Sequence, residues 1–419
     1  MASQHWSPPD PERADVCVVG SGTHYISGIS YYTYFLTRAL SQRMSASAVL
    51  MRALIPRRFY PGRDRVGADI TAYRLSEVVP TIDGVNWWGL PSIVRAARFV
   101  RRQRPRVMVL QWWTGAVLPW YLILARVARH GGGRTVIEFH EDLDTGEGAL
   151  PLVRPVVHRG LRHLIRHASG FVVHSEWDRT RLSAALGLDA DRVAVVPHGP
   201  YELAGASSQA SATNGATTIL FFGTIRPYKG VEHLVEAFDR LPRGDGQRWR
   251  LLIVGETWQG WTLPLELAVK SRFASDIEIV NRYVADAEVP GYFARADLVA
   301  LPYLRSSASG PLHITMSAGL PVVVTEVGGL PEATRGYGGA VVVRPADPAS
   351  LAAGLVVARD AAPRQLDAPL SWDDVADQYA AFLHEVLGFE GARSAQRSAE
   401  SSSMADEILT ERQVEVVGL

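Results

Sequence analysis

The stretch Thr218–His233, TILFFGTIRPYKGVEH, decides the fold class because it joins a buried strand, a loop and the start of a helix. Its apolar run stops at Gly223, and apolar residues with helical spacing begin at Val231. The loop between them carries Arg226 and Lys229. Cations between the end of a strand and the start of a helix suit an anionic ligand. An ordinary turn with two solvated basic residues explains the same loop equally well.

A second unit of this kind follows at residues 296–318. The segment 296–303, ADLVALPY, has the pattern of a strand, and a polar loop leads from it to Gly310. Pro311 fits the first position of a helix, where a missing N–H costs no hydrogen bond. Another apolar strand over 321–325 leads into the sequence VGGLPE. Such alternation of strands and helices predicts parallel sheets with helices on both faces.

Three sequence words together resemble the retaining, nucleotide-sugar-dependent glycosyltransferases of family 4, which have the GT-B fold. They are VVPHG at 195–199, FFGTIRPYKG at 221–230 and SGPLHITMSAGLPVVVTEVGGLPE at 309–332. Their order and separation fit the second half of such an enzyme, and the alternation of strands and helices fits over roughly residues 15–388. The resemblance implies two doubly wound, Rossmann-like α/β domains that face each other across a cleft.

The sequence departs from the family pattern in two places. Many members have an arginine where this chain has Thr224, whereas the arginine here is Arg226. A shift of two residues on an extended backbone keeps a side chain on the same face, so Arg226 can keep the diphosphate role. Many members also have paired glutamates, which align with Ser306 and Ile314. The chain therefore resembles a branch that lacks the paired glutamates, and its donor recognition must differ there.

Length and charge indicate two domains. A chain of 419 residues exceeds what one hydrophobic core usually supports. The first 200 residues carry an excess of basic side chains, and the remainder carries an equal excess of acidic ones. We expect a disordered lead over 1–14, an acceptor-side domain over 15–204, a linker over 205–217, a nucleotide-sugar-binding domain over 218–370, a helix over 371–388 that returns to the first domain, and a disordered tail over 389–419.

The resemblance assigns roles to residues near the ends of predicted strands. His140 ends the strand in VIEFHED, and ligands of open α/β sheets bind at that edge. The family often has a histidine there that approaches the donor sugar. The expected catalytic residues are His140, Arg226 and Lys229. The expected donor-binding residues are Gly28, Gly223, Arg226, Lys229, Tyr283, Ser309, Gly310 and Pro311. A capping or core histidine is the plainer alternative for His140, and an ordinary strand-to-helix turn is the plainer alternative for Gly28.

Two further histidines, His174 and His198, also follow predicted strands. The short motifs around them resemble family motifs that line the cleft. Structural turns explain both of them at least as well.

A metal site is the competing explanation for the acidic loop after His140. Asp142 and Asp144 spell DxD, a spacing at which carboxylates can hold Mg²⁺ or Mn²⁺ beside a donor diphosphate. A second α/β half with its own cations follows this motif, which argues against that reading. GT-B enzymes usually neutralise the leaving diphosphate with side-chain cations and helix amino ends. We expect no metal and no cofactor, with the nucleotide sugar as co-substrate.

Cysteine content and hydropathy bear on location. Cys17 is the only cysteine, so no disulfide can form within the chain and a reducing cytoplasm is expected. No stretch approaches the length needed to span a bilayer. The basic stretches 52–65 and 93–104 could hold a lipid-linked or phosphorylated acceptor at the inner face of the membrane. A solvated arginine face over an ordinary packing stripe is the explanation that we favour. No nucleic-acid partner is expected.

Two functional hypotheses follow. The leading one is a hexosyltransferase that moves a sugar with retention from a nucleotide-diphosphate donor to a hydroxyl acceptor, such as a glycan, a glycolipid or a natural product. The other is a non-catalytic sugar-nucleotide sensor or partner subunit, which the missing glutamates leave open.

Overall fold

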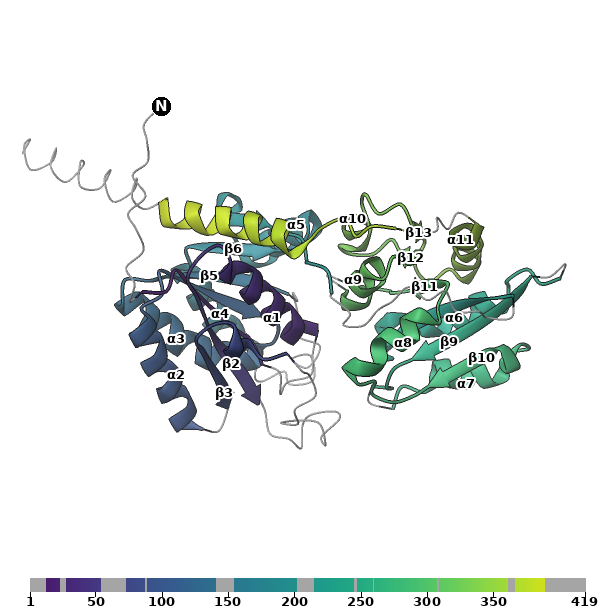
Figure 1. Cartoon of the computed structure of the whole chain (residues 1–419), viewed down its shortest axis with the longest axis horizontal. Coiled ribbons are helices and arrows are strands. Elements are labelled where there is room, and N and C mark those ends of the chain that lie inside the picture. The colour runs from purple at the N-terminus through teal and green to yellow at the C-terminus, as the bar shows by residue number, and fades with distance from the viewer. Residues whose placement is uncertain are drawn as a thin grey trace, which may run out of the picture.

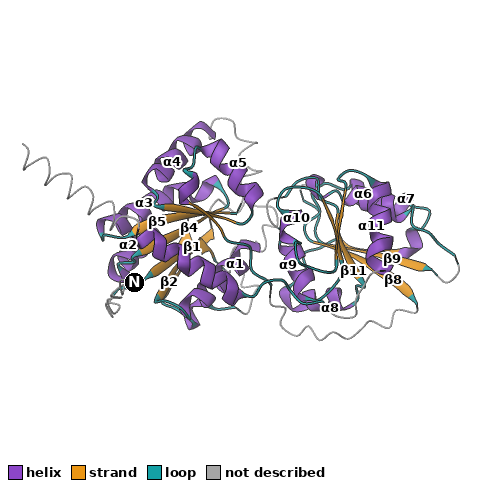
Figure 2. Cartoon of the chain, turned by 90° about the horizontal axis from the view of Figure 1, so that it is seen from above, coloured by secondary structure: helices purple, strands orange, loops and turns teal. Residues whose placement is uncertain are grey.

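The computed structural model describes residues 13–22, 28–53, 73–86, 89–140, 154–201, 215–244, 247–258, 260–306, 309–360 and 366–388. These residues form two α/β domains that lie side by side (Figure 1). In each domain helices cover both faces of a parallel sheet, as Figure 2 shows. The predicted fold class is therefore confirmed. Most of the expected lead and all of the expected tail lie outside the described residues.

The first domain is built on a seven-stranded parallel sheet with the order β3-β2-β1-β4-β5-β6-β7. Its strands are β1 (Val16–Ser21), β2 (Ala46–Ala53), β3 (Thr81–Asn86), β4 (Val107–Trp112), β5 (Arg134–Phe139), β6 (Gly170–Val173) and β7 (Val193–Val195). Its helices are α1 (Gly28–Ser41), α2 (Leu90–Gln103), α3 (Leu118–His130), α4 (Arg154–His167) and α5 (Glu176–Leu186). The central strands are mostly apolar because both faces of the sheet are covered.

The second domain repeats this winding in a six-stranded parallel sheet with the order β10-β9-β8-β11-β12-β13. Its strands are β8 (Ala216–Phe222), β9 (Arg248–Val254), β10 (Ile277–Val280), β11 (Leu298–Leu301), β12 (Val322–Thr325) and β13 (Ala340–Val343). Its helices are α6 (Val231–Phe238), α7 (Leu263–Lys270), α8 (Val289–Ala294), α9 (Gly310–Ser317), α10 (Leu330–Ala333) and α11 (Pro348–Asp360). The strand order reverses between β8 and β11, and such reversal points are where open α/β sheets bind ligands.

Three local features differ from the expectations. Strand β3 was not predicted, because Gly84, with a φ of +107°, interrupts its apolar pattern. Strand β8 begins at Ala216, inside the expected linker, because the first residues of β8 and β9 already pair. Helix α9 begins at Gly310, one residue before the expected start, because Ser309 serves as its N-cap.

The helix at residues 372–388 packs on the first domain although the second domain precedes it in sequence (Figure 1). Trp372 and Tyr379 are buried in the same core cluster as Tyr32 of α1. The indole Nε1 of Trp372 donates a hydrogen bond to the carbonyl oxygen of Pro200 at 2.6 Å. The chain therefore crosses between the domains twice.

The basic stretch at 93–104 mostly coincides with α2, whereas most of the stretch at 52–65 lies outside the described residues. Ile93 and Val100 are buried, while Arg101 and Arg102 are exposed. This pattern is that of an arginine face over a packing stripe. None of the helices in the described parts of the chain combines the length and the apolar character that crossing a membrane requires.

Candidate active site

Close backbone contacts fix the loop after β8. Gly223 and Gly230 have φ values of +128° and +61°, in the region that favours glycine. A Cβ atom on Gly230 would lie 2.1 Å from the carbonyl oxygen of Pro302, which follows β11. A Cβ atom on Gly223 would lie 3.5 Å from the Cγ atom of Pro311 in α9. The loop is thereby held against the amino end of α9.

Aromatic rings position the two cations of this loop. The guanidinium carbon of Arg226 lies 3.8 Å from the ring centroid of Trp258. The ammonium nitrogen of Lys229 lies 3.6 Å from the ring centroid of Tyr303. Such contacts hold a cation without neutralising it. Arg226 makes no ion pair with a carboxylate in the described part of the chain, so its charge is available to an anionic ligand.

The amino end of α9 is capped by Ser309. The Ser309 hydroxyl accepts a hydrogen bond from the backbone N–H of Leu312 at 3.3 Å and lies 3.2 Å from the hydroxyl of Tyr303. Its side chain is buried, so it supports the helix end and does not project from it. The first backbone amides of α9, near Gly310, form the partially positive end of the helix.

The amino ends of α1 and α9 meet at the hydroxyl of Tyr201. This hydroxyl donates a hydrogen bond of 2.7 Å to the carbonyl oxygen of Gly28, the first residue of α1. It would lie 3.3 Å from a Cβ atom on Gly310. Burial raises the pKa of Tyr201. Two helix amino ends from different domains therefore converge on one buried hydroxyl. We call Gly28, Tyr201, Arg226, Lys229 and Gly310 the interdomain site.

A second bridge between the domains lies beside Tyr283. The hydroxyl of Tyr31 in α1 donates a short hydrogen bond to the carboxylate of Asp286 in the second domain. Burial raises the pKa of Tyr31, and Asp286 and Tyr283 raise it further. Tyr283 is half-buried, and its effect on Tyr31 of the first domain places it near the contact between the domains.

The residues that align with the family glutamates do not place a carboxylate at this site. Ile314 is half-buried and packs against the core of the second domain. The carbonyl oxygen of Ser306 would lie 1.5 Å from a Cβ atom on Gly328, so this segment makes a tight backbone contact. Ile314 thus contributes packing, and the backbone of Ser306 contributes a close contact.

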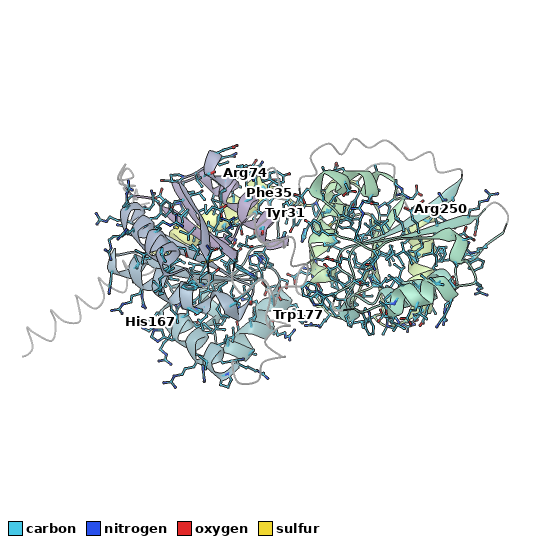
Figure 3. The ribbon with its side chains drawn as sticks, turned by 90° about the horizontal axis from the view of Figure 1, so that it is seen from below. Tyr31, Phe35, Arg74, His167, Trp177 and Arg250 are labelled. Atoms are coloured by element: carbon cyan, nitrogen blue, oxygen red, sulfur yellow. The ribbon has the colours of Figure 1, made fainter. Side chains whose placement is uncertain are left out.

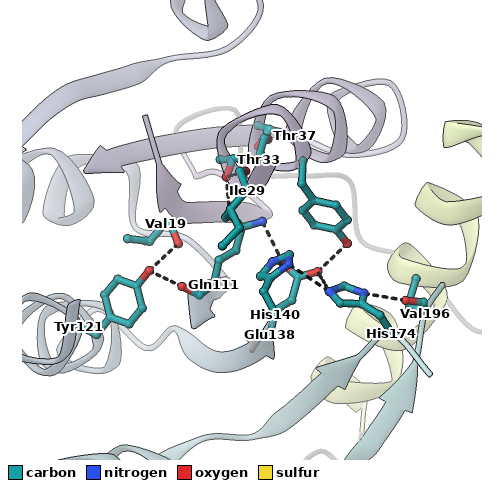
Figure 4. Close-up of polar contacts among 11 residues, drawn as sticks. Val19, Ile29, Thr33, Thr37, Gln111, Tyr121, Glu138, His140, His174 and Val196 are labelled. Carbon is teal, nitrogen blue, oxygen red and sulfur yellow. Dashed lines mark hydrogen bonds and ion pairs between the residues drawn. The ribbon is translucent and has the colours of Figure 1, made fainter. Parts of the chain in front are cut away.

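Glu138 is the centre of a buried polar network in the first domain (Figure 4). Its carboxylate accepts a hydrogen bond of 2.6 Å from the hydroxyl of Tyr32 and one of 3.0 Å from the side-chain amide of Gln111. Its second oxygen lies 3.5 Å from Nε2 of His140, and its first oxygen lies 3.9 Å from Nε2 of His174. Burial alone would raise the pKa of Glu138, but His140, His174 and Tyr32 outweigh it and lower that pKa.

Hydrogen bonds determine which nitrogen of each histidine carries a proton. The carbonyl oxygen of Val196 can only accept, so Nδ1 of His174, 3.0 Å away, is the donor. Burial and the neighbouring His140 lower the pKa of His174 to about 4, so its Nε2 is an unprotonated acceptor at neutral pH. Nδ1 of His140, 3.2 Å from that atom, must donate. Nε2 of His140 faces the Glu138 carboxylate.

The same three residues bring one potential ligand atom each within 4.8 Å of one another, a spacing compatible with a metal ion. The donor chemistry argues against a metal here. One nitrogen of His174 donates to Val196, the other accepts from His140, and the oxygens of Glu138 accept from Tyr32 and Gln111. A metal would break the contact between the histidines and leave buried polar atoms without partners. Asp142 and Asp144 lie outside the described residues.

His198 and His313 connect this network to the second domain. Their rings stack at a centroid distance of 4.4 Å, and His198 also contacts the ring of Tyr32 at 4.5 Å. Burial, His313 and His174 lower the pKa of His198 well below its usual range. Neutral imidazoles therefore line the contact between α9 and the first domain.

The structure thus brings most of the predicted residues together at the interdomain site, and it buries the His140 side chain beside Glu138 and His174. Both ring nitrogens of His140 face partners within the first domain, and its side chain is buried. Sequence reasoning missed Tyr32, Glu138, Tyr201 and His313. A charged residue inside the apolar run VIEF was the signal for Glu138, whereas nothing local distinguishes the other three.

Residues 216–358 match the family model described as glycosyl transferases group 1, and residues 27–199 match the model described as glycosyl transferase 4-like domain. The chain belongs to this family of glycosyltransferases. A D-inositol 3-phosphate glycosyltransferase from Nocardia farcinica is 30% identical to this glycosyltransferase over 172 residues. That match spans 38% of this chain and 37% of the relative, so little more than a third of the relative is compared.

Solved structures of low sequence identity share the fold of this glycosyltransferase. HepE from Anabaena in complex with UDP gives a TM-score of 0.61 at 13% identity and covers 92% of this chain and 100% of its own. The catalytic domain of starch synthase IV from Arabidopsis thaliana, bound to ADP and acarbose, gives a TM-score of 0.60 at 14% identity. The match covers 89% of this chain and 99% of that domain. Sucrose-phosphate synthase from Thermosynechococcus elongatus gives a TM-score of 0.59 at 13% identity. The match covers 93% of this chain and 99% of that synthase. The predicted GT-B architecture is confirmed.

Proposed function

We propose that this glycosyltransferase transfers a sugar, with retention, from a nucleotide-diphosphate donor to a hydroxyl acceptor. One observation carries the proposal: helix amino ends from both domains meet at Tyr201, beside the loop that presents Arg226 and Lys229. Helix amino ends and cations together suit the charge of a diphosphate. Neighbouring folds with bound UDP or ADP are compatible with such a donor.

The roles of the two cations follow from the charge that develops in the reaction. Cleavage of the bond between the anomeric carbon and the phosphate leaves negative charge on the diphosphate and oxocarbenium character on the sugar. Arg226 grips two phosphate oxygens through its planar fork, and Lys229 adds a point charge. The amides near Gly310 complete the binding of the leaving group.

The departing phosphate is the proposed acceptor of the proton. Among the residues that the structure describes, the interdomain site offers no pair of exposed carboxylates for a double displacement, and Glu138 is fully buried. The acceptor hydroxyl therefore attacks on the face from which the diphosphate leaves, and its proton passes to a phosphate oxygen. This route retains the configuration at the anomeric carbon.

We propose that His140 acts through the position of its ring. Its buried ring lies between Glu138 and His174 at the carboxyl edge of the first sheet. Glu138 keeps the ring in place at the edge of the sheet where ligands of open α/β sheets bind. We expect binding of the donor to displace the Tyr201 hydroxyl from its position between Gly28 and Gly310.

We further propose that catalysis needs neither a metal nor a cofactor, because side-chain cations and helix amino ends already supply positive charge for the leaving group. The proposed location is the cytoplasm, with contact to the inner face of the membrane through the basic first domain. The alternative, a sugar-nucleotide sensor or partner subunit, is favoured by Ser306 and Ile314, because neither residue carries a carboxylate.

A panel of nucleotide sugars tests the proposal. Donor hydrolysis and transfer would be followed for each donor, and NMR would establish the anomeric configuration of any product. Turnover with one donor and retained configuration is the expected result. Nucleotide binding without hydrolysis or transfer of any donor would instead establish the sensor, and an inverted product would overturn the proposed proton route.

A further inference from the structure

A groove between α3 and α4 lies on the opposite edge of the first domain from the interdomain site. Its volume is about 280 Å³. The two helices touch where α3 begins, since a Cβ atom on Gly160 would lie 2.5 Å from a side-chain carbon of Leu118. The groove is lined by later residues of both helices and by Thr135 near the start of β5. Five residues of strand, about 16 Å, separate Thr135 from His140.

The rim of the groove is basic and has no acidic partner. Arg126 and Arg129 from α3 and His163 and His167 from α4 line it. Within the described part of the chain, no carboxylate pairs with either arginine. The rings of His163 and His167 lie 4.4 Å apart. Desolvation lowers the pKa of His163, and the neighbouring His167, Arg129 and Arg166 lower it further. Positive charge is thus crowded around one cavity.

The floor of the groove carries an independent sign of a ligand. Thr135 is 2% exposed, and its hydroxyl has no hydrogen-bond partner among the described residues. Burying a hydroxyl without a partner is unfavourable. Basic residues in the last turn of a helix also complement its dipole, which explains their presence on each helix. The dipole does not explain a buried hydroxyl without a partner below them.

We propose that this groove binds a phosphate monoester. The two guanidinium groups would hold phosphate oxygens, and the Thr135 hydroxyl would donate to one of them. Leu122, Ile123 and Leu164 give the groove apolar walls for the carbon skeleton that carries the phosphate. The ligand is either a soluble phosphate ester or the headgroup of a phospholipid, and the same contacts serve both. The groove does not depend on the donor reaction at the interdomain site.

The test compares matched variants of the full chain. Arg126→Gln with Arg129→Gln removes two charges from the groove, and Thr135→Val removes the buried hydroxyl. Arg159→Gln with Arg162→Gln is the control, because it removes two exposed charges from α4 at positions that do not line the groove. Probes are inorganic phosphate, glycerol phosphate, and vesicles of phosphatidylcholine with or without phosphatidic acid.

NMR of labelled histidine follows the ring of His163, which lines the groove, so it detects binding there and not at distant sites. Glycerol phosphate should raise the pKa of His163, because an anion offsets the crowded cations. The affinity for glycerol phosphate that this titration measures should fall roughly tenfold or more in the groove variants, and it should not fall in the control. Thr135→Val should also raise the melting temperature of the free protein, because it removes a polar group without a partner.

Vesicle sedimentation distinguishes the two ligand sources. Binding to phosphatidic acid that the groove variants lose and the control keeps identifies a lipid headgroup, whereas a response to soluble esters alone identifies a free metabolite. No response of His163 to any probe, or equal losses in the groove variants and the control, would overturn the proposal. Sugar transfer should be unchanged in all these variants, so the result stands apart from that of the donor panel.

Discussion

The imidazole of His313, on α9 of the second domain, stacks on that of His198, from the first domain, with an angle of 18° between the rings. Both side chains are buried, and the contact joins the domains directly beside the polar network of Glu138. Burial, together with His174, lowers the pKa of His313 to about 3. The contact between the domains therefore depends on neutral histidines.

The first prediction is that acid weakens the protein through these histidines. The unfolded chain takes up protons below about pH 6.5, whereas native His313 and His174 do so only near 3 and 4. Their stabilising contribution is present above about pH 6.5 and is lost as the pH falls toward these native values. In that window each histidine should lower the free energy of unfolding by up to about 1.4 kcal/mol for each pH unit of acidification.

Urea unfolding at several pH values measures this slope. His313→Phe keeps a stacked ring and removes one titrating group, so stability should depend less steeply on pH. His130→Gln, at an exposed position, is the control and should leave the slope unchanged. An unaltered slope in His313→Phe would contradict the prediction.

The second prediction concerns Arg226. Its charge should matter most when the diphosphate departs, so Arg226→Ala should cost about 2–4 kcal/mol of transition-state stabilisation. Arg226→Lys should recover only part of this, because lysine lacks the planar fork. Kinetics with the donor found in the panel measures both effects, and nucleoside diphosphate should stabilise Arg226→Ala less than wild type against heat.

The matched control for Arg226 is Arg250→Ala, an exposed arginine on β9 on the far side of the second domain (Figure 3). It should retain turnover and the full thermal response to nucleotide. If Arg226→Ala behaves as this control does, the loop after β8 is an ordinary turn.

The third prediction concerns Glu138. Glu138→Gln keeps the shape of the side chain and removes the charge that faces His140. Transition-state stabilisation should fall by about 1.5–3 kcal/mol, which lowers turnover roughly ten- to a hundredfold. Binding of nucleoside diphosphate should be unchanged. In a His140→Ala background the same change should have little further effect, because Glu138 acts through that ring. Equal losses in both backgrounds would show that Glu138 supports the fold alone.

The fourth prediction concerns metal. Activity should survive excess chelator, and it should survive the replacement of both Asp142 and Asp144 by alanine, because cations of the protein neutralise the leaving group. Abolition by chelator and recovery with Mn²⁺ would favour the DxD explanation.

The sequence predicted what depends on local pattern. Strands β4, β10 and β13 have the expected bounds, because each is a short and mostly apolar run. The loop after β8 was also found, because glycine and cations mark it directly. The partners of Glu138 could not be predicted from the sequence, because Tyr32 lies 106 residues from it and contacts it only after α1 has packed on the sheet. Tyr201 is another such case, because its role depends on two helix ends brought together by the fold.

The helix at residues 372–388 has a consequence for the order of events during synthesis. Trp372 and Tyr379 belong to the core of the first domain, yet the ribosome makes them after the whole second domain. At ordinary translation speed the first domain waits on the order of ten seconds or more for them. During that time its apolar surface around Phe35, which Trp372 later covers by stacking, stays open to solvent and to chaperones. The nascent first domain therefore completes its folding only when the second is already made.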